Sequence, residues 1–259
     1  MILKKNDRKE FFMHFNNTIN HLKLWCREKA HIYEMVYEKH KDITYVGISE
    51  AYELEFKLST LIDRSFENTD DLKKTILELV DVKYETVDYG IRNELAQYII
   101  EKVKKEFCEY VEEITEKNDT LSFADIPYKR IILGEEAQIL LERFKTVWKY
   151  DNSDYWYPLN GDEPEEITGK FFIMYDYLKP YKERLEKIIG LPETHIYRCD
   201  EADLLFEYCT ETVELSETGR SEVFYTDKDF TWAIYFSHES TVAFAGSIVP
   251  AVKALLMLE

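Results

Sequence analysis

The hydrophobic pattern of this chain changes near residue 118, and the change limits the possible folds more than any other feature of the sequence. Between residues 7 and 116 the apolar side chains recur at steps of three and four with no proline, which predicts amphipathic helices. All six prolines and several short apolar runs come after residue 120. We therefore expect an α+β fold, with a helical bundle domain over residues 1–118 and a mixed α+β domain over residues 119–259.

Four helices are expected in the first part. The first covers residues 7–40, and a break at residues 42–47 separates it from a second helix that Ser49 caps. A third, short helix begins at residues 69–71, where acidic side chains suit the positive end of the helix dipole. A longer fourth helix follows Gly90. Their apolar stripes can be buried against one another in a bundle.

The second part alternates between strand-like and helix-like segments. The pattern indicates strands at residues 130–134, 171–177, 194–199 and 222–225, and helices at residues 135–150, 179–189 and 248–258. The clearest β pattern is a closing hairpin, with strands at residues 232–236 and 241–245. We expect the strands to form a small antiparallel sheet.

Charge limits the kind of partner that this chain can bind. The 259 residues carry a formal net charge of -18, which argues against nucleic acid because phosphate contacts need clustered Lys and Arg. Residues 1–118 contain 19 basic and 24 acidic side chains, whereas residues 119–259 contain 14 and 27. The acidic second half suits a basic protein partner.

The spacing of cysteines, glycines and apolar residues argues against several classes of protein. The four cysteines form no CxxC pair, so neither a zinc knuckle nor a thioredoxin-type site is indicated. The eight glycines are dispersed without a phosphate-binding loop, and we expect no cofactor. No apolar run approaches the roughly 18 residues of a membrane span, and charge precedes any signal-like run at the N-terminus. We expect a cytoplasmic protein with no membrane partner, and the pattern leaves its oligomeric state open.

Ser237, His238 and Glu239 combine a nucleophile, a base and an acid, as in some catalytic triads. Triad members converge from separate segments, whereas adjacent residues in a strand or turn point in different directions. These three residues fall between two strand-like runs, where the hairpin must reverse. We therefore favour a turn whose polar side chains bond to local backbone groups. The alternative is an enzyme in which His238 works with acids such as Asp200, Glu201 or Glu239.

Glu10, His14 and His21 form a second candidate site in the helical part. Their spacing places them on one broad face of the first predicted helix, and carboxylate and imidazole ligands occur in the cores of helical bundles. No HExxH motif accompanies them, and no Glu-x-x-His from another helix completes a two-metal site. We therefore expect no metal site and keep these residues as the alternative.

An aromatic run and an acidic loop in the second part could form a docking surface for a basic protein. The candidate binding residues are Tyr155, Trp156, Tyr157, Asp162, Glu163, Glu165 and Glu166. Tyr and Trp are enriched at interfaces, and acidic groups around them would steer a basic partner. The alternative is that the aromatic run packs in the core beneath a solvated loop.

The closing hairpin also carries a short signature. It consists of Trp232, Ile234, Tyr235, Ser237, His238, Glu239, Ser240, Thr241, Phe244 and Gly246. The signature resembles one at the C-terminus of many small, uncharacterised bacterial proteins, some of which are similar to the immunity proteins of bacterial toxin systems. Residues 155–159 resemble a second, weaker part of it. The resemblance implies a non-enzymatic, cytoplasmic, acidic protein that binds another protein, often a basic nuclease, and it assigns no active-site residues.

The sequence thus favours a non-enzymatic bacterial protein, immunity-like, that binds a basic protein through an acidic surface. An enzyme that uses His238 and a metal-binding helical bundle are the alternatives.

Overall fold

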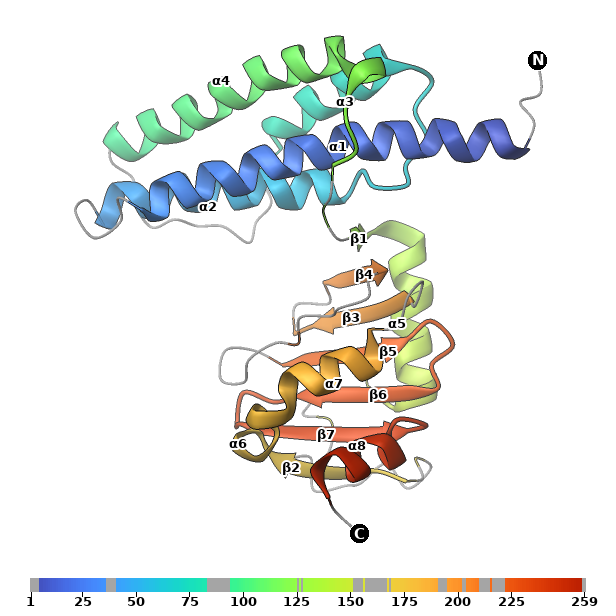
Figure 1. Ribbon diagram of the computed structural model, residues 1–259. Coiled ribbons are helices and arrows are strands. Elements are labelled where there is room, and N and C mark those ends of the chain that lie inside the picture. Colours follow the sequence, from blue (N-terminus) through green and yellow to red (C-terminus); the bar gives the residue numbers. More distant parts are fainter. Residues whose placement is uncertain are drawn as a thin grey trace. The chain divides into compact units, whose positions relative to one another are not determined.

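The computed structural model describes residues 5–35, 41–82, 94–124, 126, 128–150, 156, 167, 169–190, 195–201, 204–209, 215 and 222–257. The side chains of residues 5–14, 41–43 and 119 are outside this description. The chain divides into two compact units, Met1–Ile126 and Pro127–Glu259 (Figure 1). This division falls somewhat later than the boundary expected after residue 118.

The described part of the first unit is helical. It contains α1 (Lys5–Glu34), α2 (Lys41–Ser59), α3 (Thr69–Val80), α4 (Glu94–Glu116) and the short η2 (Asn118–Thr120). Helix α1 packs along α2, and α4 packs against both α2 and α3 (Figure 1). Each helix buries a stripe of apolar side chains at helical spacing, which in α1 consists of Phe15, Ile19, Leu22, Cys26 and Ala30.

Helix α2 differs from the expected helix at its start. The break predicted at residues 42–47 is wrong, because α2 continues through these residues from Lys41, and Ser49 therefore lies inside the helix instead of capping it. Gly47 is buried in α2, where an added Cβ atom would lie 2.7 Å from the ring of Tyr33 in α1. The missing side chain thus permits close packing of α1 and α2, and this tertiary contact outweighs the low helix propensity of glycine.

In its described residues, the second unit is built on a seven-stranded sheet with the order β1-β4-β3-β5-β6-β7-β2 (Figure 1). The strands are β1 (Tyr128–Ile132), β2 (Phe171–Met174), β3 (His195–Asp200), β4 (Leu205–Cys209), β5 (Val223–Asp227), β6 (Trp232–Phe236) and β7 (Thr241–Gly246). All these pairings are antiparallel. The α+β class and the antiparallel sheet are confirmed, although the sheet is larger than expected. The predicted closing hairpin is formed by β6 and β7.

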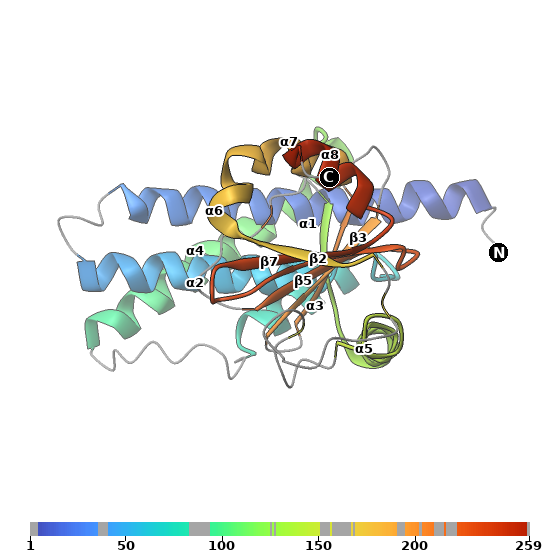
Figure 2. The same ribbon diagram turned by 90° about the horizontal axis from the view of Figure 1, so that it is seen from below.

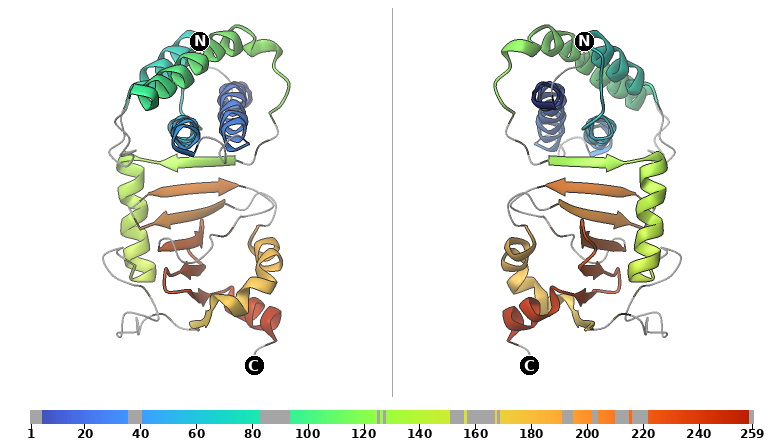
Figure 3. Two further views of the ribbon diagram at one scale, coloured as in Figure 1. Left: turned by 90° about the vertical axis from the view of Figure 1, so that its left-hand side faces the viewer. Right: turned by 90° about the vertical axis from the view of Figure 1, so that its right-hand side faces the viewer.

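Helices cover both faces of the sheet. Helix α5 (Gly134–Trp148) lies on one face, and α6 (Tyr175–Leu178), η3 (Lys179–Tyr181), α7 (Lys182–Ile189) and α8 (Val249–Leu256) lie on the other (Figures 2 and 3). Successive side chains of a strand point to opposite faces of the sheet, so alternate residues belong to two separate hydrophobic cores. Phe224 and Tyr235 pack with α5, whereas Tyr225 and Phe236 pack with α7 and α8. We call these sides the α5 face and the α7 face.

The helices in the described ranges include none that combines the length and the apolar character needed to cross a membrane.

Gly246 ends β7 with a positive φ of 74°. A Cβ atom at this position would lie 2.2 Å from the carbonyl oxygen of Thr231 and 3.0 Å from the ring of Trp148. Only glycine fits both the backbone conformation and the space, which gives a structural reason for this residue in the hairpin signature.

Candidate functional site

Ser237, His238 and Glu239 lie between β6 and β7, where the chain reverses. Ser237 is fully buried, and its Oγ accepts a hydrogen bond from the backbone N–H of Glu239 at 3.0 Å. The backbone N–H of Ser240 donates to the carbonyl oxygen of Ser237 at 3.2 Å. Ser237 therefore stabilises the local turn.

His238 is held between two carboxylates. Its Nδ1 bonds to Oε1 of Glu222, which also accepts the backbone N–H of His238 at 3.2 Å. Its Nε2 lies 3.3 Å from Oε1 of Glu239. Because both ring nitrogens face carboxylate oxygens, the geometry suits a structural role, in which His238 links the turn to the start of β5, better than the role of a base aimed at a substrate.

The three acids expected to assist His238 do not lie together in the structure. Glu239 contacts it, but Asp200 pairs with Arg198, whose Nη2 donates to Oδ2 at 2.8 Å. Glu201 contributes its backbone N–H to the carbonyl oxygen of Glu222 at 3.1 Å. Glu222 itself was not foreseen by the motif, because the pairing of β5 with β6 brings it to the turn and no sequence spacing records that pairing.

Three buried oxygens lie close to this turn without a hydrogen bond to any described residue: Oε2 of Glu222, the hydroxyl of Tyr235 and Oγ1 of Thr241. Val223 pairs with Phe236, and Phe236 pairs with Val242. The residues next to these in the chain, Glu222, Tyr235 and Thr241, therefore lie at the same end of the α5 face. Burial raises the pKa of Tyr235, and the nearby Glu222 carboxylate raises it further. Buried oxygens of this kind are normally satisfied by ordered water.

Trp156 belongs to the core on the α5 face. Its side chain is 3% exposed, and its Nε1 donates to the carbonyl oxygen of Trp148 at 2.6 Å. Its ring packs edge-on against Phe224 and Tyr235, with centroid distances of 4.9 and 5.8 Å. The core-packing alternative therefore describes Trp156, which is too buried to serve in a docking surface. The other candidates of that surface lie outside the described residues: Tyr155, Tyr157, Asp162, Glu163, Glu165 and Glu166.

The candidate metal ligands gain no support from the described residues. Glu10 and His14 belong to α1, but their side chains are outside the description. The Nε2 of His21 lies 2.8 Å from the backbone carbonyl oxygen of Ser122. Among the described residues, no group of three or more His, Cys, Asp or Glu side chains could hold a metal ion.

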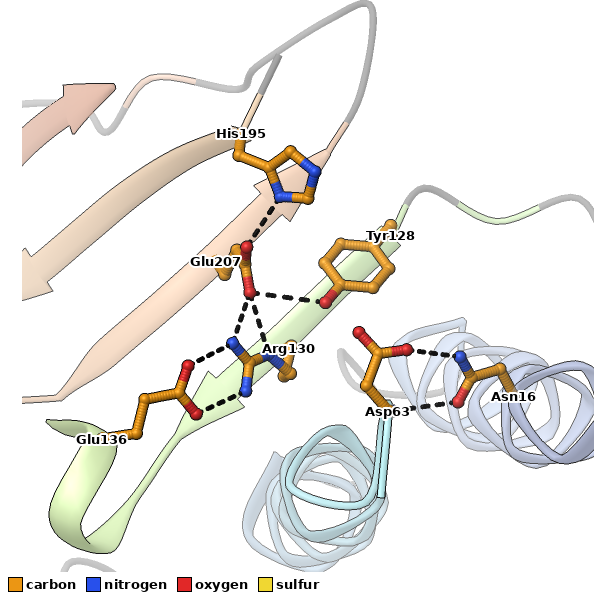
Figure 4. Close-up of polar contacts among 7 residues, drawn as sticks. All are labelled: Asn16, Asp63, Tyr128, Arg130, Glu136, His195 and Glu207. Atoms are coloured by element: carbon orange, nitrogen blue, oxygen red, sulfur yellow. Dashed lines mark hydrogen bonds and ion pairs between the residues drawn. The ribbon is translucent and has the colours of Figure 1, made fainter. Parts of the chain in front are cut away.

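A second polar cluster lies on the α5 face at strands β1, β4 and β3 (Figure 4). At its centre is Glu207, whose side chain is 7% exposed. Arg130 donates to Oε2 of Glu207 from Nε at 2.9 Å and from Nη2 at 2.6 Å, and it binds both carboxylate oxygens of Glu136 at 2.7 Å. The Nδ1 of His195 lies 2.7 Å from Oε1 of Glu207, and the hydroxyl of Tyr128 donates to Oε2 at 3.4 Å. We call these five residues the Glu207 cluster.

The Glu207 cluster compensates the burial of its central charge. A buried carboxylate is strongly unfavourable unless it is paired and hydrogen-bonded. The hydrogen bonds to Glu136 and then to Glu207 raise the pKa of Arg130, and this forked geometry is the strong form of such a pair. Burial and the charge of Glu207 raise the pKa of Tyr197, its register partner on β3. The cluster thereby joins the outer strand β1 to β4 and β3.

The sequence contains no local signal for the Glu207 cluster. Arg130 and Glu207 are 77 residues apart and become neighbours only through the register of β1 with β4. Opposite charges in two strand-like runs are the one available hint, and many pairs in this charged chain satisfy that description.

Figure 4 also shows a reciprocal pair within the helical unit. Nδ2 of Asn16 donates to Oδ1 of Asp63 at 2.7 Å, and the backbone N–H of Asp63 donates to Oδ1 of Asn16 at 3.0 Å. Asp63 has a φ of 61° in the turn that follows α2. The pair therefore stabilises a left-handed turn and has a structural role.

A hollow of about 450 Å³ lies on the surface of α4. Its lining includes Tyr98, Glu101, Lys102, Lys105, Glu106 and Glu109. Lys102 and Glu106 are 3.9 Å apart, and Lys105 and Glu109 are 3.8 Å apart, each one helical turn along. Such pairs are typical of a solvated helix face.

Comparison of the chain with protein-family models, with curated proteins and with solved structures finds no match. Function is therefore inferred from the residues and their geometry.

Proposed function

We propose that this chain is a non-enzymatic binding protein that holds a basic protein at the β2 edge of its sheet. One observation carries the proposal: two large apolar side chains of β2 are exposed, Phe172 at 45% and Met174 at 47%. Apolar side chains gathered at one place on a surface are typical of protein interaction sites.

The register of β2 explains why these two side chains are exposed. Phe171 and Ile173 pack against the core of the α7 face, while Phe172 and Met174 alternate to the other side, opposite Ala243 and Thr241 of β7. Within the described residues, β2 is the last strand of the sheet. An outer strand with exposed apolar side chains can pair with an extended segment of a partner, whose backbone supplies hydrogen bonds. We call Phe172 and Met174 the β2-edge pair.

The net charge of the whole chain favours a basic partner. Tyr177, beyond the β2-edge pair on α6, is strongly exposed, and the neighbouring Asp176 is exposed as well. The backbone N–H of Tyr175 donates to the carbonyl oxygen of Ser240 at 2.8 Å. This hydrogen bond links α6 to the turn that carries the exposed Glu239. With a net charge of -18, the chain would attract basic proteins over a distance set by the salt concentration.

The hairpin signature resembles one in uncharacterised bacterial proteins, some of which are similar to immunity proteins, and this resemblance suggests the class of partner. Such proteins neutralise toxins, and a basic nuclease would match the charge of this chain. The two carboxylates around His238 support a structural role for that residue, in keeping with a binding protein.

The test is retention of lysate proteins by the immobilised chain, compared between two matched variants. The first replaces both Phe172 and Met174 with serine, and the control replaces the exposed Ile139 of α5 with serine. We expect wild type and the control variant to retain the same basic protein at low salt and to release it at high salt. The double variant should not retain it, because the apolar contact is lost.

Two outcomes would contradict the proposal. One is retention of the same proteins by the double variant and by wild type. The other is the absence of any retained basic protein at every salt concentration.

A further inference from the structure

The outward side of α4 carries an ordered row of charges. Side chains at steps of three and four lie on one face of a helix. On the side of α4 opposite its buried stripe, the residues at these steps are all exposed: Tyr98, Lys102, Lys105, Glu109, Glu112 and Glu116. We call these six residues the α4 row. Its lysines precede its glutamates along the chain, so one half of the row is basic and the other half is acidic.

The charges at the centre of the α4 row are only weakly engaged within the chain. Lys105 and Glu109 are 3.8 Å apart, and their side chains are 78% and 67% exposed. Exposed ion pairs of this kind contribute little to stability, because solvent screens them and both side chains lose freedom. Lys105 and Glu109 can therefore exchange each other for new partners at little cost.

Apolar surface accompanies the basic half of the α4 row. Tyr98 is 60% exposed, and Leu95, one turn before it, is 48% exposed. The hollow of about 450 Å³ has all its described lining residues on α4, between Tyr98 and Glu109. Tyrosine is enriched at protein interfaces. The basic half thus has both the apolar side chains and the concave surface of a contact site.

The order of the charges selects the kind of partner. A wholly basic partner would be repelled by the lysines, and a wholly acidic partner would be repelled by the glutamates. A second copy of α4 that runs antiparallel satisfies both halves, because its glutamates lie opposite the lysines. When Lys105 lies opposite Glu109 of the second copy, Lys102 lies opposite Glu112 of that copy. Two-fold symmetry repeats each of these contacts.

We propose that the α4 row is a homodimer interface, at which the α4 helices of two chains pack antiparallel. The row extends over about 27 Å of helix from Tyr98 to Glu116. The net charge of -18 opposes association of two copies in general, so the lysines of the row are needed for this contact. The dimer does not depend on partner binding at the β2 edge.

The test is sedimentation velocity over a range of chain concentrations in about 0.15 M salt. Lys105→Glu places like charges opposite each other twice in the dimer, and Glu109→Lys does the same with the opposite sign. Each variant should raise the dissociation constant of the dimer at least about tenfold. The matched controls are Lys74→Glu and Glu78→Lys, which reverse an exposed pair on α3 with the same spacing and the same distance of 3.8 Å. The controls should dimerise like wild type.

A mixture of the two α4 variants separates charge pairing from damage to the fold. When a Lys105→Glu chain meets a Glu109→Lys chain, the two reversed charges attract each other and the second contact keeps its native pair. We expect the mixture to dimerise about as tightly as wild type, with the folding of each variant checked by its urea midpoint. A wild-type chain that stays monomeric at every concentration would overturn the proposal. So would equal weakening by Lys105→Glu and Lys74→Glu, or a mixture that associates no more tightly than either variant alone.

Discussion

Glu50 shows how burial of one residue can make the stability of the helical unit depend on pH. Its side chain is almost fully buried in α2, and the Nζ of Lys104 is 4.0 Å away. Burial raises its pKa from the ordinary 4.5 to about 7, against the opposing effect of Lys104. The folded unit therefore favours the protonated form of this carboxyl.

The shift predicts that Glu50 destabilises the helical unit as pH rises. Below pH 4.5 the carboxyl is protonated in both folded and unfolded chains, and between 4.5 and about 7 the folded chain binds more protons. The free energy of unfolding should therefore fall across this window by roughly 3 kcal/mol on account of Glu50, and then stay level. Urea unfolding of wild type and Glu50→Gln at several pH values measures the difference, with the exposed Glu78→Gln as control. Parallel pH curves for wild type and Glu50→Gln would refute it.

The hairpin end depends on another paired residue. Glu222 accepts two hydrogen bonds from His238, and it is buried. We expect Glu222→Ala to lower the free energy of unfolding by about 1–3 kcal/mol, because it removes a charge-assisted contact. His238→Ala should have a smaller effect in the Glu222→Ala background than in wild type, since the two residues act as one pair. The free energies of unfolding are measured with urea in a double-mutant cycle. If the losses caused by the two substitutions simply add, Glu222 and His238 do not act as a pair.

At the scale of elements, the packing of α1 on α2 depends on the missing side chain of Gly47. An added Cβ atom would lie 2.7 Å from ring atoms of Tyr33, which is closer than real Cβ contacts come. The same substitution removes the flexibility of a glycine within a helix. The two effects have opposite signs, and the neighbouring ring decides which one prevails.

A substitution in two backgrounds separates these effects. Gly47→Ala should destabilise the wild-type chain by about 1 kcal/mol, because an overlap costing 1–3 kcal/mol exceeds the gain in helix propensity. In a Tyr33→Ala background the overlap is gone, and Gly47→Ala should stabilise by about 1 kcal/mol. Chemical denaturation of the four chains measures both numbers. If Gly47→Ala changes the free energy of unfolding in the same direction in both backgrounds, the Tyr33 ring does not restrict α2.

Helices and strands could be predicted from the sequence better than contacts between distant segments, for a physical reason. The stripe of α4 and the alternation in β6 and β7 follow from local spacing, which depends only on the geometry of a helix or strand. The break predicted at residues 42–47 failed because a contact with Tyr33 retains Gly47 within a helix. The partners of His238 and Glu207 are set by strand register, which brings together residues from distant segments. Local spacing could place His238 at the hairpin turn, but it could not supply Glu222.

At the scale of the whole molecule, charge and exposed apolar surface point to the same role. The chain carries a net charge of -18, and the β2-edge pair of Phe172 and Met174 is exposed on the last described strand of the sheet. Apolar contact would supply affinity at the edge, while the acidic surface would speed association with basic proteins. Added salt should therefore weaken binding mainly by slowing association.

Photo-cross-linking in living cells tests this central claim most directly. Benzoylphenylalanine replaces Phe172 in one variant and the exposed Ile139 of α5 in a matched control. We predict that illumination joins a basic protein to the chain from position 172 and not from position 139. A chain that yields no adduct from position 172, or the same adducts from both positions, would contradict the account.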